Sequence, residues 1–221
     1  MYFYYRMLIT KDTLLYGSFS KKAGNLGCKL FNTSFQYYDI NAIYKSFSIE
    51  SIHDAIISTK CLGFSGFAVS MPFKVDVIKY LDELDEIVQK TNSCNTVIIR
   101  GSKLYGYNTD YLSVYEFLNS KLDTISFLYI LGNGGYSSTV QSCCKDLHIE
   151  HEVITRSNWN KIETLRYSTI FNCTPVESIP VDSTNYFIDC INTTPTGKLL
   201  AMKQAAIQFK LYTNREFPLV I

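Results

Sequence analysis

Four short apolar runs in the second half of this 221-residue chain constrain its fold most strongly. Residues 127–131 (FLYIL) are apolar throughout, which is typical of a parallel strand that is buried on both faces of its sheet. Three more runs follow at intervals that suit alternating strands and helices, at residues 151–155 (HEVIT), 169–172 (TIFN) and 186–189 (YFID). From residue 126 onward, the pattern therefore predicts an α/β fold built on a parallel sheet.

The first half of the chain mixes strand-like alternation with helical spacing. Strands are expected at residues 13–16, ending at Gly17, and at residues 43–49, 67–69, 96–99 and 104–107. The last two strands flank a Gly-Ser pair that suits the two-residue turn of a hairpin. Helices are expected within residues 28–39, 51–60, 75–91, 111–118 and 198–209.

Two of these helices carry more detailed predictions. The helix at 75–91 would have an apolar stripe on one face and acidic groups in water on the other, the stripe being Leu81, Leu84, Ile87 and Val88 and the acidic groups Asp82, Glu83, Asp85 and Glu86. The helix at 111–118 has three candidate N-caps, which are Asn108, Thr109 and Asp110.

The composition argues against several classes of partner. With a net charge of +1, the chain has no electrostatic reason to bind nucleic acid or an anionic membrane. Its seven cysteines are an odd number without metal-ligand spacing, which favours reduced thiols in a cytoplasmic protein and predicts no metal site. The first ten residues lack the features of a signal peptide, and no apolar run approaches the roughly 20 residues that cross a bilayer.

Residues 70–110 contain the candidate catalytic groups. A lysine (Lys74), a carboxylate (Asp110), an amide (Asn95) and two hydroxyls (Ser70 and Thr109) lie at the ends of expected strands and in loops. Reduction of a ketone needs a proton donor beside the developing alkoxide, and the reverse reaction needs a base. Lys74 and Asp110 could fill these roles, although their spacing alone also suits a structural ion pair.

A Gly-rich turn directly follows the strand at 127–131. Gly132-Asn133-Gly134-Gly135 could bring backbone N–H groups close to a pyrophosphate at the start of the next helix. Ser137 stands where the usual pattern has its third glycine, so a turn without a ligand remains open. Arg156 follows the next strand, where an arginine would accommodate the 2′-phosphate of NADP, although it could also be a surface residue.

Taken together, these motifs resemble the shikimate dehydrogenase family over almost the whole chain. The resemblance is carried by GFAVSMPFK at 66–74, NSCNT at 92–96, LYGYNTD at 104–110, ILGNGG at 130–135, TRS at 155–157, FNCTP at 171–175 and QAAIQF at 204–209. The family implies an α/β substrate-binding domain at 1–113, a shortened Rossmann-type NADP-binding domain at 114–197, and a C-terminal helix within 198–221 that returns to the first domain.

The resemblance also implies a reaction and roles for residues. The reaction would be the NADPH-dependent reduction of 3-dehydroshikimate to shikimate in aromatic amino-acid biosynthesis, by a monomer or homodimer acting on a small molecule. Lys74 and Asp110 would be the catalytic pair. The ring hydroxyls would be held by Ser70, Asn95, Asp110 and Gln204. NADP would be held by Gly132, Gly134, Gly135 and Arg156, with Asn172 and Thr174 lining the same side.

Several departures from the family pattern bear on the substrate. The serine pair that binds the substrate carboxylate falls on Asn25-Leu26-Gly27 in one register, so that Asn25 would meet the carboxylate. A second register places the pair at Ser18-Phe19-Ser20, followed by Lys21-Lys22, and Lys22 could then meet the carboxylate instead of Asn25. Tyr136 is bulky for the cofactor turn, and about one helix of the Rossmann half is missing. These departures motivate a second hypothesis, a catalytically silent relative with a binding or regulatory role.

Overall fold

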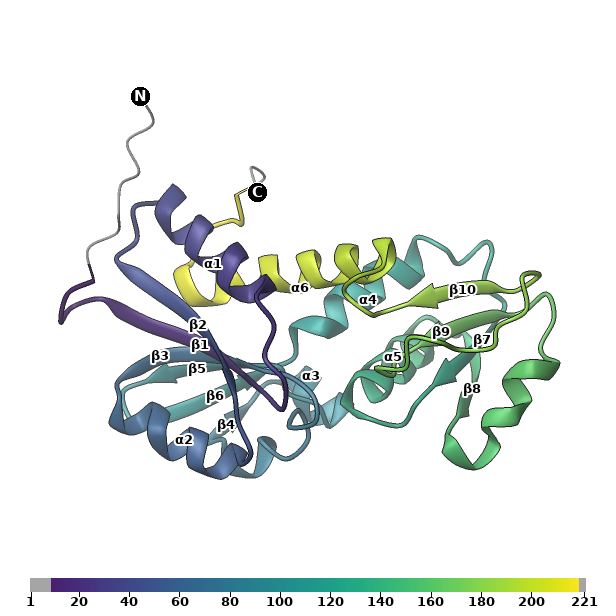
Figure 1. The fold of residues 1–221 in the computed structure, drawn as a ribbon, viewed down its shortest axis with the longest axis horizontal. Helices are drawn as coiled ribbons and strands as arrows, with labels where there is room; N and C mark the ends of the chain where they lie inside the picture. Colours follow the sequence, from purple (N-terminus) through teal and green to yellow (C-terminus); the bar gives the residue numbers. More distant parts are fainter. Residues whose placement is uncertain (1–8, 219–221) are drawn as a thin grey trace. The chain divides into compact units, whose positions relative to one another are not determined.

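The computed structural model describes residues 9–218, and the expectation that the chain lacks a signal peptide concerns residues that lie partly outside this range. The chain forms two compact units (Figure 1), the first from residues 1–83, 95–106 and 205–221, the second from residues 84–94 and 107–204. The helix α6 (Pro195–Thr213) begins in the second unit and ends in the first. The domain limits predicted at residues 113 and 197 stay a prediction.

The first unit is built on a six-stranded mixed sheet in the order β2-β1-β3-β5-β6-β4. Its strands are β1 (Leu14–Ser20), β2 (Ala42–Ser48), β3 (Phe64–Val69), β4 (Glu83–Leu84), β5 (Thr96–Arg100) and β6 (Lys103–Tyr107). β1 is parallel to both β2 and β3, whereas β5 is antiparallel to β3. The hairpin predicted at residues 96–107 is confirmed, with Gly101 at φ +61° in its turn.

The prediction that the first strand ends at Gly17 is wrong, because β1 continues through Gly17 to Ser20. A side chain at this position would place its Cβ 2.7 Å from the carbonyl oxygen of Lys45 on β2. Glycine therefore lets the backbones of β1 and β2 approach closely in the middle of the sheet and does not end the strand.

Aromatic rings fill the core of the first unit. On one face of the sheet, α1 (Leu26–Tyr37) and the last turns of α6 bury Phe31, Phe35 and Phe209. The ring of Phe31 stacks on that of Tyr44 with centroids 4.5 Å apart. A second group of rings lies on the other face, formed by Phe19, Phe47, Phe64 and Phe67. The helix α2 (Ile52–Cys61), capped by Ser51, matches the prediction at 51–60.

The single helix predicted at residues 75–91 is wrong. The structure has a 3₁₀ turn, η1 (Ile78–Tyr80), then β4, then a short helix α3 (Glu86–Thr91). Asp82 is exposed, as predicted, but it also pairs with Leu104: its N–H donates to the Leu104 carbonyl at 2.9 Å, and its carboxylate accepts from the Leu104 N–H at 2.8 Å. Asp85 accepts from Val88 N at 2.8 Å and so begins α3 as its N-cap.

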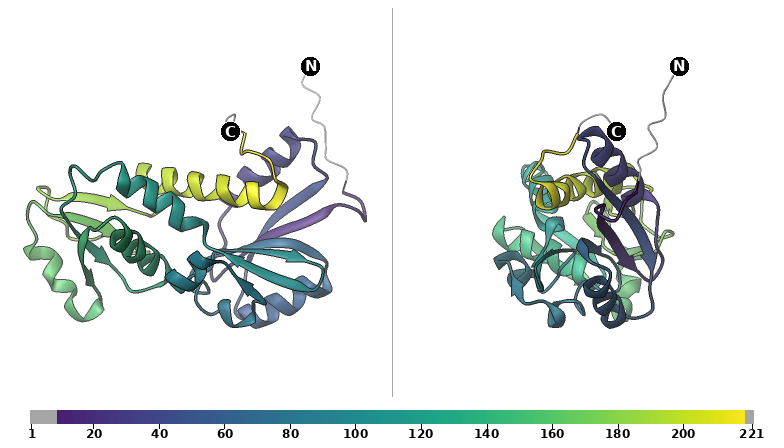
Figure 2. Two further views of the ribbon diagram at one scale, coloured as in Figure 1. Left: turned by 180° about the vertical axis from the view of Figure 1, so that it is seen from behind. Right: turned by 90° about the vertical axis from the view of Figure 1, so that its left-hand side faces the viewer.

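The second unit is built on a four-stranded sheet in the order β10-β9-β7-β8, with every pair parallel. Its strands are β7 (Phe127–Leu131), β8 (Glu150–Ile154), β9 (Thr169–Asn172) and β10 (Tyr186–Asp189). Two helices, α4 (Thr109–Asn119) and α5 (Gly135–Asp146), share a core with the sheet residues Leu128, Ile130, Phe171 and Ile188, and Figure 2 shows this unit from two further sides. The predicted α/β fold with a parallel second sheet is confirmed.

The opposite face of this sheet is covered by irregular structure. The 3₁₀ segment η2 (Arg156–Thr164) packs Ile162 against Leu131, Ile154 and Ile170. The β9–β10 connection, residues 173–185, contains no helix and adds Ile179 and Val181 to this core. Extended chain thus covers this part of the sheet, and the omission of about one helix, which was predicted after Asp189, stays a prediction.

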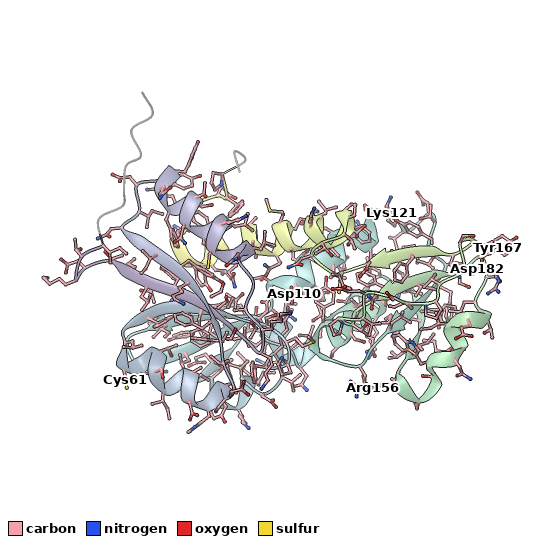
Figure 3. The ribbon with its side chains drawn as sticks, viewed as in Figure 1. Cys61, Asp110, Lys121, Arg156, Tyr167 and Asp182 are labelled. Atoms are coloured by element: carbon pink, nitrogen blue, oxygen red, sulfur yellow. The ribbon has the colours of Figure 1, made fainter. Side chains whose placement is uncertain are left out.

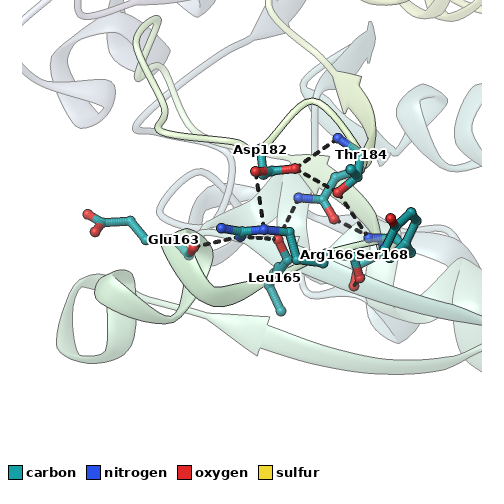
Figure 4. Close-up of polar contacts among 8 residues, drawn as sticks. Glu163, Leu165, Arg166, Ser168, Asp182 and Thr184 are labelled. Carbon is teal, nitrogen blue, oxygen red and sulfur yellow. Dashed lines mark hydrogen bonds and ion pairs between the residues drawn. The ribbon is translucent and has the colours of Figure 1, made fainter.

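Polar bonds secure this connection to the end of η2 (Figure 4). The Arg166 guanidinium donates to the carbonyls of Glu163 and Leu165, both at 2.8 Å, and forms an ion pair with Asp182 at 3.1 Å. Asp182 also accepts from the N–H and hydroxyl of Thr184 at 3.0 and 2.6 Å. These contacts hold the β9–β10 connection against the end of η2.

Candidate active site

In the first unit, three predicted site residues lie around the end of β3. Ser70 directly follows this strand and donates its N–H to the Phe19 carbonyl at 2.9 Å, while Val69 donates to the Asn95 carbonyl at 2.8 Å. Lys74 is half-buried in the turn that follows. The structure therefore brings Ser70, which follows β3, close to Asn95, which precedes the neighbouring strand β5. Lys74 lies four residues after Ser70 in the chain.

The Asn95 side chain is 3% exposed and is held by its neighbours. The Thr96 hydroxyl donates to Asn95 Oδ1 at 2.9 Å, and Gln208 of α6 donates to the same Thr96 hydroxyl at 2.7 Å. Because the Thr96 hydroxyl accepts from Gln208, its own proton is available for Asn95, and this bond orients the Asn95 carboxamide oxygen toward Thr96. The last turns of α6 thus help to set the orientation of a predicted substrate-binding group.

Asn25 and Gly27 lie at the start of α1. Asn25 is exposed and is the N-cap residue, but its side chain makes no capping hydrogen bond. A Cβ added at Gly27 would lie 2.9 Å from Tyr44 Cε1 and 3.3 Å from the Tyr44 hydroxyl. The tyrosine ring therefore fills the space that a side chain at residue 27 would need. Sequence reasoning missed this tyrosine, because residues 27 and 44 meet only when α1 packs on β2.

In the second unit, Asp110 lies in the first turn of α4. It is 5% exposed, and its N–H donates to the side chain of Asn108 at 3.1 Å, which identifies Asn108 as the N-cap among the three predicted candidates. The neighbouring Thr109 hydroxyl donates to Gln204 Oε1 of α6 at 3.2 Å. Asp110 and Gln204 therefore belong to the second unit, and Lys74 belongs to the first.

The Gly-rich turn lies between β7 and α5, as the sequence predicted. Gly132 has φ +101°, and a Cβ there would lie 2.8 Å from Thr174 Cγ2, so the conformation and the close packing both require glycine. Gly134 is the N-cap of α5 without a side-chain capping bond, and Gly135 is the first helical residue. The first N–H groups of α5 thus form the kind of helix N-terminus that can bind a phosphate.

Asn172 and Thr174 follow β9 beside this turn. The buried Asn172 carboxamide accepts from the Thr174 N–H and hydroxyl at 2.9 and 2.7 Å, and donates to Asp189 Oδ1 at 3.0 Å and to the Val176 carbonyl at 3.3 Å. Because its oxygen and nitrogen are both engaged internally, Asn172 holds Thr174 in place next to Gly132.

Arg156 follows β8 at the same carboxyl edge of the sheet. Its side chain is exposed and projects outward (Figure 3). The residue before it, Thr155, begins η2 through a capping box in which the Thr155 N–H donates to Asn158 Oδ1 at 2.7 Å. The structure therefore places Arg156 in a defined turn after the second strand of the βαβ unit, where its guanidinium is accessible.

The cysteines do not form a reactive or metal-binding group in the part of the chain that the structure describes. Cys143 and Cys144 lie on α5, and burial raises the pKa of both thiols, that of Cys144 to about 12. Both side chains pack in the core of the second unit. Within residues 9–218, no cluster of three or more His, Cys, Asp and Glu side chains is placed to hold a metal ion. None of the helices in this range is long and apolar enough to cross a bilayer.

Comparison with known proteins identifies relatives of this chain. A family model, the shikimate dehydrogenase substrate binding domain, matches residues 25–97. A Clostridium beijerinckii protein named shikimate dehydrogenase (NADP(+)) is 31% identical over 80% of this chain and 74% of its own length. A Haemophilus influenzae shikimate dehydrogenase-like protein is 33% identical over 65% of this chain and 53% of its own length. The chain thus spans between about half and three quarters of these relatives.

Solved structures share the same fold. A shikimate 5-dehydrogenase-like protein superposes with a TM-score of 0.77 and 25% identity, covering 95% of this chain and 94% of that chain. The Thermus thermophilus shikimate 5-dehydrogenase, solved with NADP(H) and shikimate, superposes with a TM-score of 0.75 and 16% identity, covering 93% of this chain and 95% of that chain. The second likeness, at this low identity, concerns the fold alone.

Proposed function

Because this chain belongs to the shikimate dehydrogenase family, we propose that it is an NADP-dependent oxidoreductase that interconverts 3-dehydroshikimate and shikimate. The observation that carries this proposal is the presence of Lys74, Asn95 and Asp110 in the three motifs that resemble the substrate and catalytic motifs of the family. The relative from Clostridium beijerinckii, of which the chain spans 74%, is named as an NADP(+) enzyme of this kind.

In this proposal, Lys74 and Asp110 perform the proton chemistry. Lys74 donates a proton to the alkoxide oxygen that develops when the ketone of 3-dehydroshikimate is reduced, and takes it back in the oxidation of shikimate. Asp110 accepts a hydrogen bond from the reacting hydroxyl. Ser70, Asn95 and Gln204 bind the remaining ring hydroxyls, and Asn25 at the start of α1 meets the substrate carboxylate.

The second unit has the features that an NADP site needs. Gly132, Gly134 and Gly135 form the turn into α5, and Gly134 has open space where a side chain would stand, so that the backbone N–H groups of the first turn could donate to the oxygens of a pyrophosphate. The exposed Arg156 guanidinium can bind a 2′-phosphate through charge-assisted hydrogen bonds. Thr174, held by Asn172, lines the turn beside Gly132. The bound nicotinamide supplies or accepts the hydride.

The test is the absorbance of reduced nicotinamide with purified protein, shikimate and either NADP or NAD. We expect turnover with NADP, and a loss of about 100-fold or more in kcat for Lys74→Ala, the usual contribution of a general acid–base group. Lys79→Ala is the matched control, because Lys79 is an exposed lysine nearby in the chain, beside the ring of Tyr80. NADPH affinity, followed by fluorescence, should be unchanged in both variants.

Each outcome has a distinct meaning. Substantial residual activity in Lys74→Ala would exclude the assigned role of this lysine. NADPH binding without turnover of shikimate would exclude this substrate and point to a different cyclic polyol acid. Failure to bind NADPH would contradict the proposed function as a whole and favour a catalytically silent relative.

A further inference from the structure

Asn108 lies at a buried junction of three helices in the second unit. Its side chain is 6% exposed, and its carboxamide is fully engaged. Oδ1 accepts from the N–H of Asp110 at 3.1 Å, and Nδ2 donates to the hydroxyls of Thr91 and Thr139, both at 2.9 Å. Thr91 ends α3, Asp110 begins α4 and Thr139 lies in the second turn of α5, so a single side chain joins all three helices.

The direction of each hydrogen bond in this group is determined by its neighbours. Both threonines are fully buried, and their hydroxyls donate to carbonyls of their own helices, Thr91 to Ile87 at 2.6 Å and Thr139 to Gly135 at 3.0 Å. With their protons committed in this way, the two hydroxyls can only accept from residue 108. Position 108 must therefore supply two donors and one acceptor, which a carboxamide does and a carboxylate does not.

The bonds form a continuous path between two parts of the site. The path runs from the Asp110 N–H to Asn108, from Asn108 to the Thr139 hydroxyl, and from that hydroxyl to the Gly135 carbonyl. Gly135 is the first residue of α5 in the turn proposed to bind the cofactor phosphates. A further bond from the Ser138 hydroxyl to the Thr91 carbonyl ties α5 to α3 at the same junction.

From this geometry, we propose that Asn108 is a positioning residue that couples the carboxylate-bearing turn of α4 to the Gly-rich turn at the start of α5. This inference rests on the proposed function, because it assigns a consequence to the placement of Asp110. If the path sets the position of Asp110, loss of the bond between Asn108 and Thr139 must slow the chemical step, although Thr139 is fully buried and is not one of the residues proposed to bind the substrate.

The test compares two disruptive variants with a conservative one. Thr139→Val keeps the shape of the side chain but leaves one Asn108 hydrogen without an acceptor. Asn108→Asp places a carboxylate oxygen opposite two hydroxyls whose protons already go to carbonyl oxygens, so neither hydroxyl can donate to it. We expect both to lower kcat with shikimate by about tenfold, counted per NADPH-binding site so that misfolded protein does not contribute. Thr139→Ser restores the hydroxyl and should recover most of the loss.

The control is Ser142→Ala, three residues further along α5. Its hydroxyl is also buried, but donates at 3.0 Å to the Ser138 carbonyl within the same helix and is not bonded to Asn108. We expect its kcat to equal that of the parent protein. Thermal unfolding of all four variants separates an effect on stability from an effect on kcat, and if Asn108→Asp does not fold, Thr139→Val carries the test.

The inference is overturned if kcat per NADPH-binding site is the same in Thr139→Val and the parent, or if Thr139→Ser is impaired as strongly as Thr139→Val. A merely structural role would lower the melting temperature and leave this kcat unchanged. Failure of the proposed function looks different, since the parent protein would then not turn over shikimate before any variant is made.

Discussion

In the first unit, aromatic rings pack against the sheet. In the second unit, which has a smaller sheet, hydrogen bonds and an ion pair hold the irregular segments that cover one of its faces. Phe31, Phe35 and Phe209 contact one another on one face of the six-stranded sheet. In the second unit, one face of the four-stranded sheet is covered by two helices, and the other by η2 and an extended connection that Arg166 and Asp182 secure.

The difference follows from what each unit has available to bury. A helix satisfies its own backbone and offers a face of side chains, so α1 and α6 can cover the first sheet mainly by side-chain packing. The β9–β10 connection has no helix, and its backbone groups need partners from elsewhere. Asn172 donates to the Val176 carbonyl, and within the connection Asp182 accepts from the Thr184 N–H. Asn185 in turn joins the connection to the Leu165 carbonyl. Removing a ring from the first unit should therefore cost more than removing a surface ion pair from the second.

The largest effect is expected for Phe35→Ala. Phe35 is fully buried and contacts the rings of Tyr16, Phe31 and Phe209. The cavity should lower the free energy of unfolding of the first unit by about 3–5 kcal/mol, measured by denaturant titration and by hydrogen exchange in β1 and β2. Tyr37→Ala on the same helix is the control, because Tyr37 is 61% exposed. Equal effects of the two variants would contradict a core held by ring packing.

A smaller effect is expected from breaking the Arg166–Asp182 ion pair. The two side chains are 49% and 31% exposed, so a double-mutant cycle with Arg166→Ala and Asp182→Ala should give a coupling of at most about 1 kcal/mol. Hydrogen exchange should accelerate in residues 176–185 and leave the first unit unchanged. The pair Lys11–Asp12, 88% and 70% exposed, serves as a comparison with no expected coupling. Unchanged exchange in residues 176–185 would show that apolar packing alone holds this connection.

The sequence predicted the second sheet closely and one helix of the first unit wrongly. Both outcomes arise because local composition reports burial within a segment but not pairing with a distant one. The run at 169–172 is buried throughout and the run at 127–131 is buried over most of its length, so their apolar composition reports their structure directly. The run at 186–189 is fully buried only at Ile188. At residues 75–91 the local pattern suits a helix, but Asp82 pairs with Leu104, 22 residues away. A tertiary pairing of this kind leaves no mark in the local spacing of apolar residues.

The candidate site shows the same limit. Lysine, carboxylate and glycine at the ends of strands can be recognised from the sequence because the chemistry requires those residue types. The residues that hold them cannot be recognised in this way: Asn108 meets Thr91 and Thr139, which lie 17 and 31 residues away. From sequence alone, Asn108 was only one of three possible helix caps. Its two further bonds depend on how α3, α4 and α5 pack together.

The smallest expected effect, which disappears in acid, concerns Asp146 at the end of α5. Lys90 and Tyr111 both donate to its carboxylate, and the hydrogen bond from Lys90, followed by that from Tyr111, lowers the pKa of Asp146 below its usual 3.8. A depressed pKa stabilises the folded state above the unfolded-state value. This contribution is lost as the pH falls from about 3.8 through the folded-state pKa, because the unfolded chain takes up the proton first.

Asp146→Asn should therefore lower the melting temperature near neutral pH, and the difference from the parent should shrink as the pH falls below about 4. The contribution of Asp85 to stability changes with pH in the opposite direction, because burial raises the pKa of this carboxyl. Taking the difference between variant and parent at each pH removes that contribution and those of other carboxyls. The aromatic core of the first unit offers no titrating group of this kind at Phe31, Phe35 or Phe209, so hydrogen exchange there should be the same in variant and parent at every pH. A difference that stayed constant from neutral pH to below the folded-state pKa would show that Asp146 acts through its shape and packing and not through its charge.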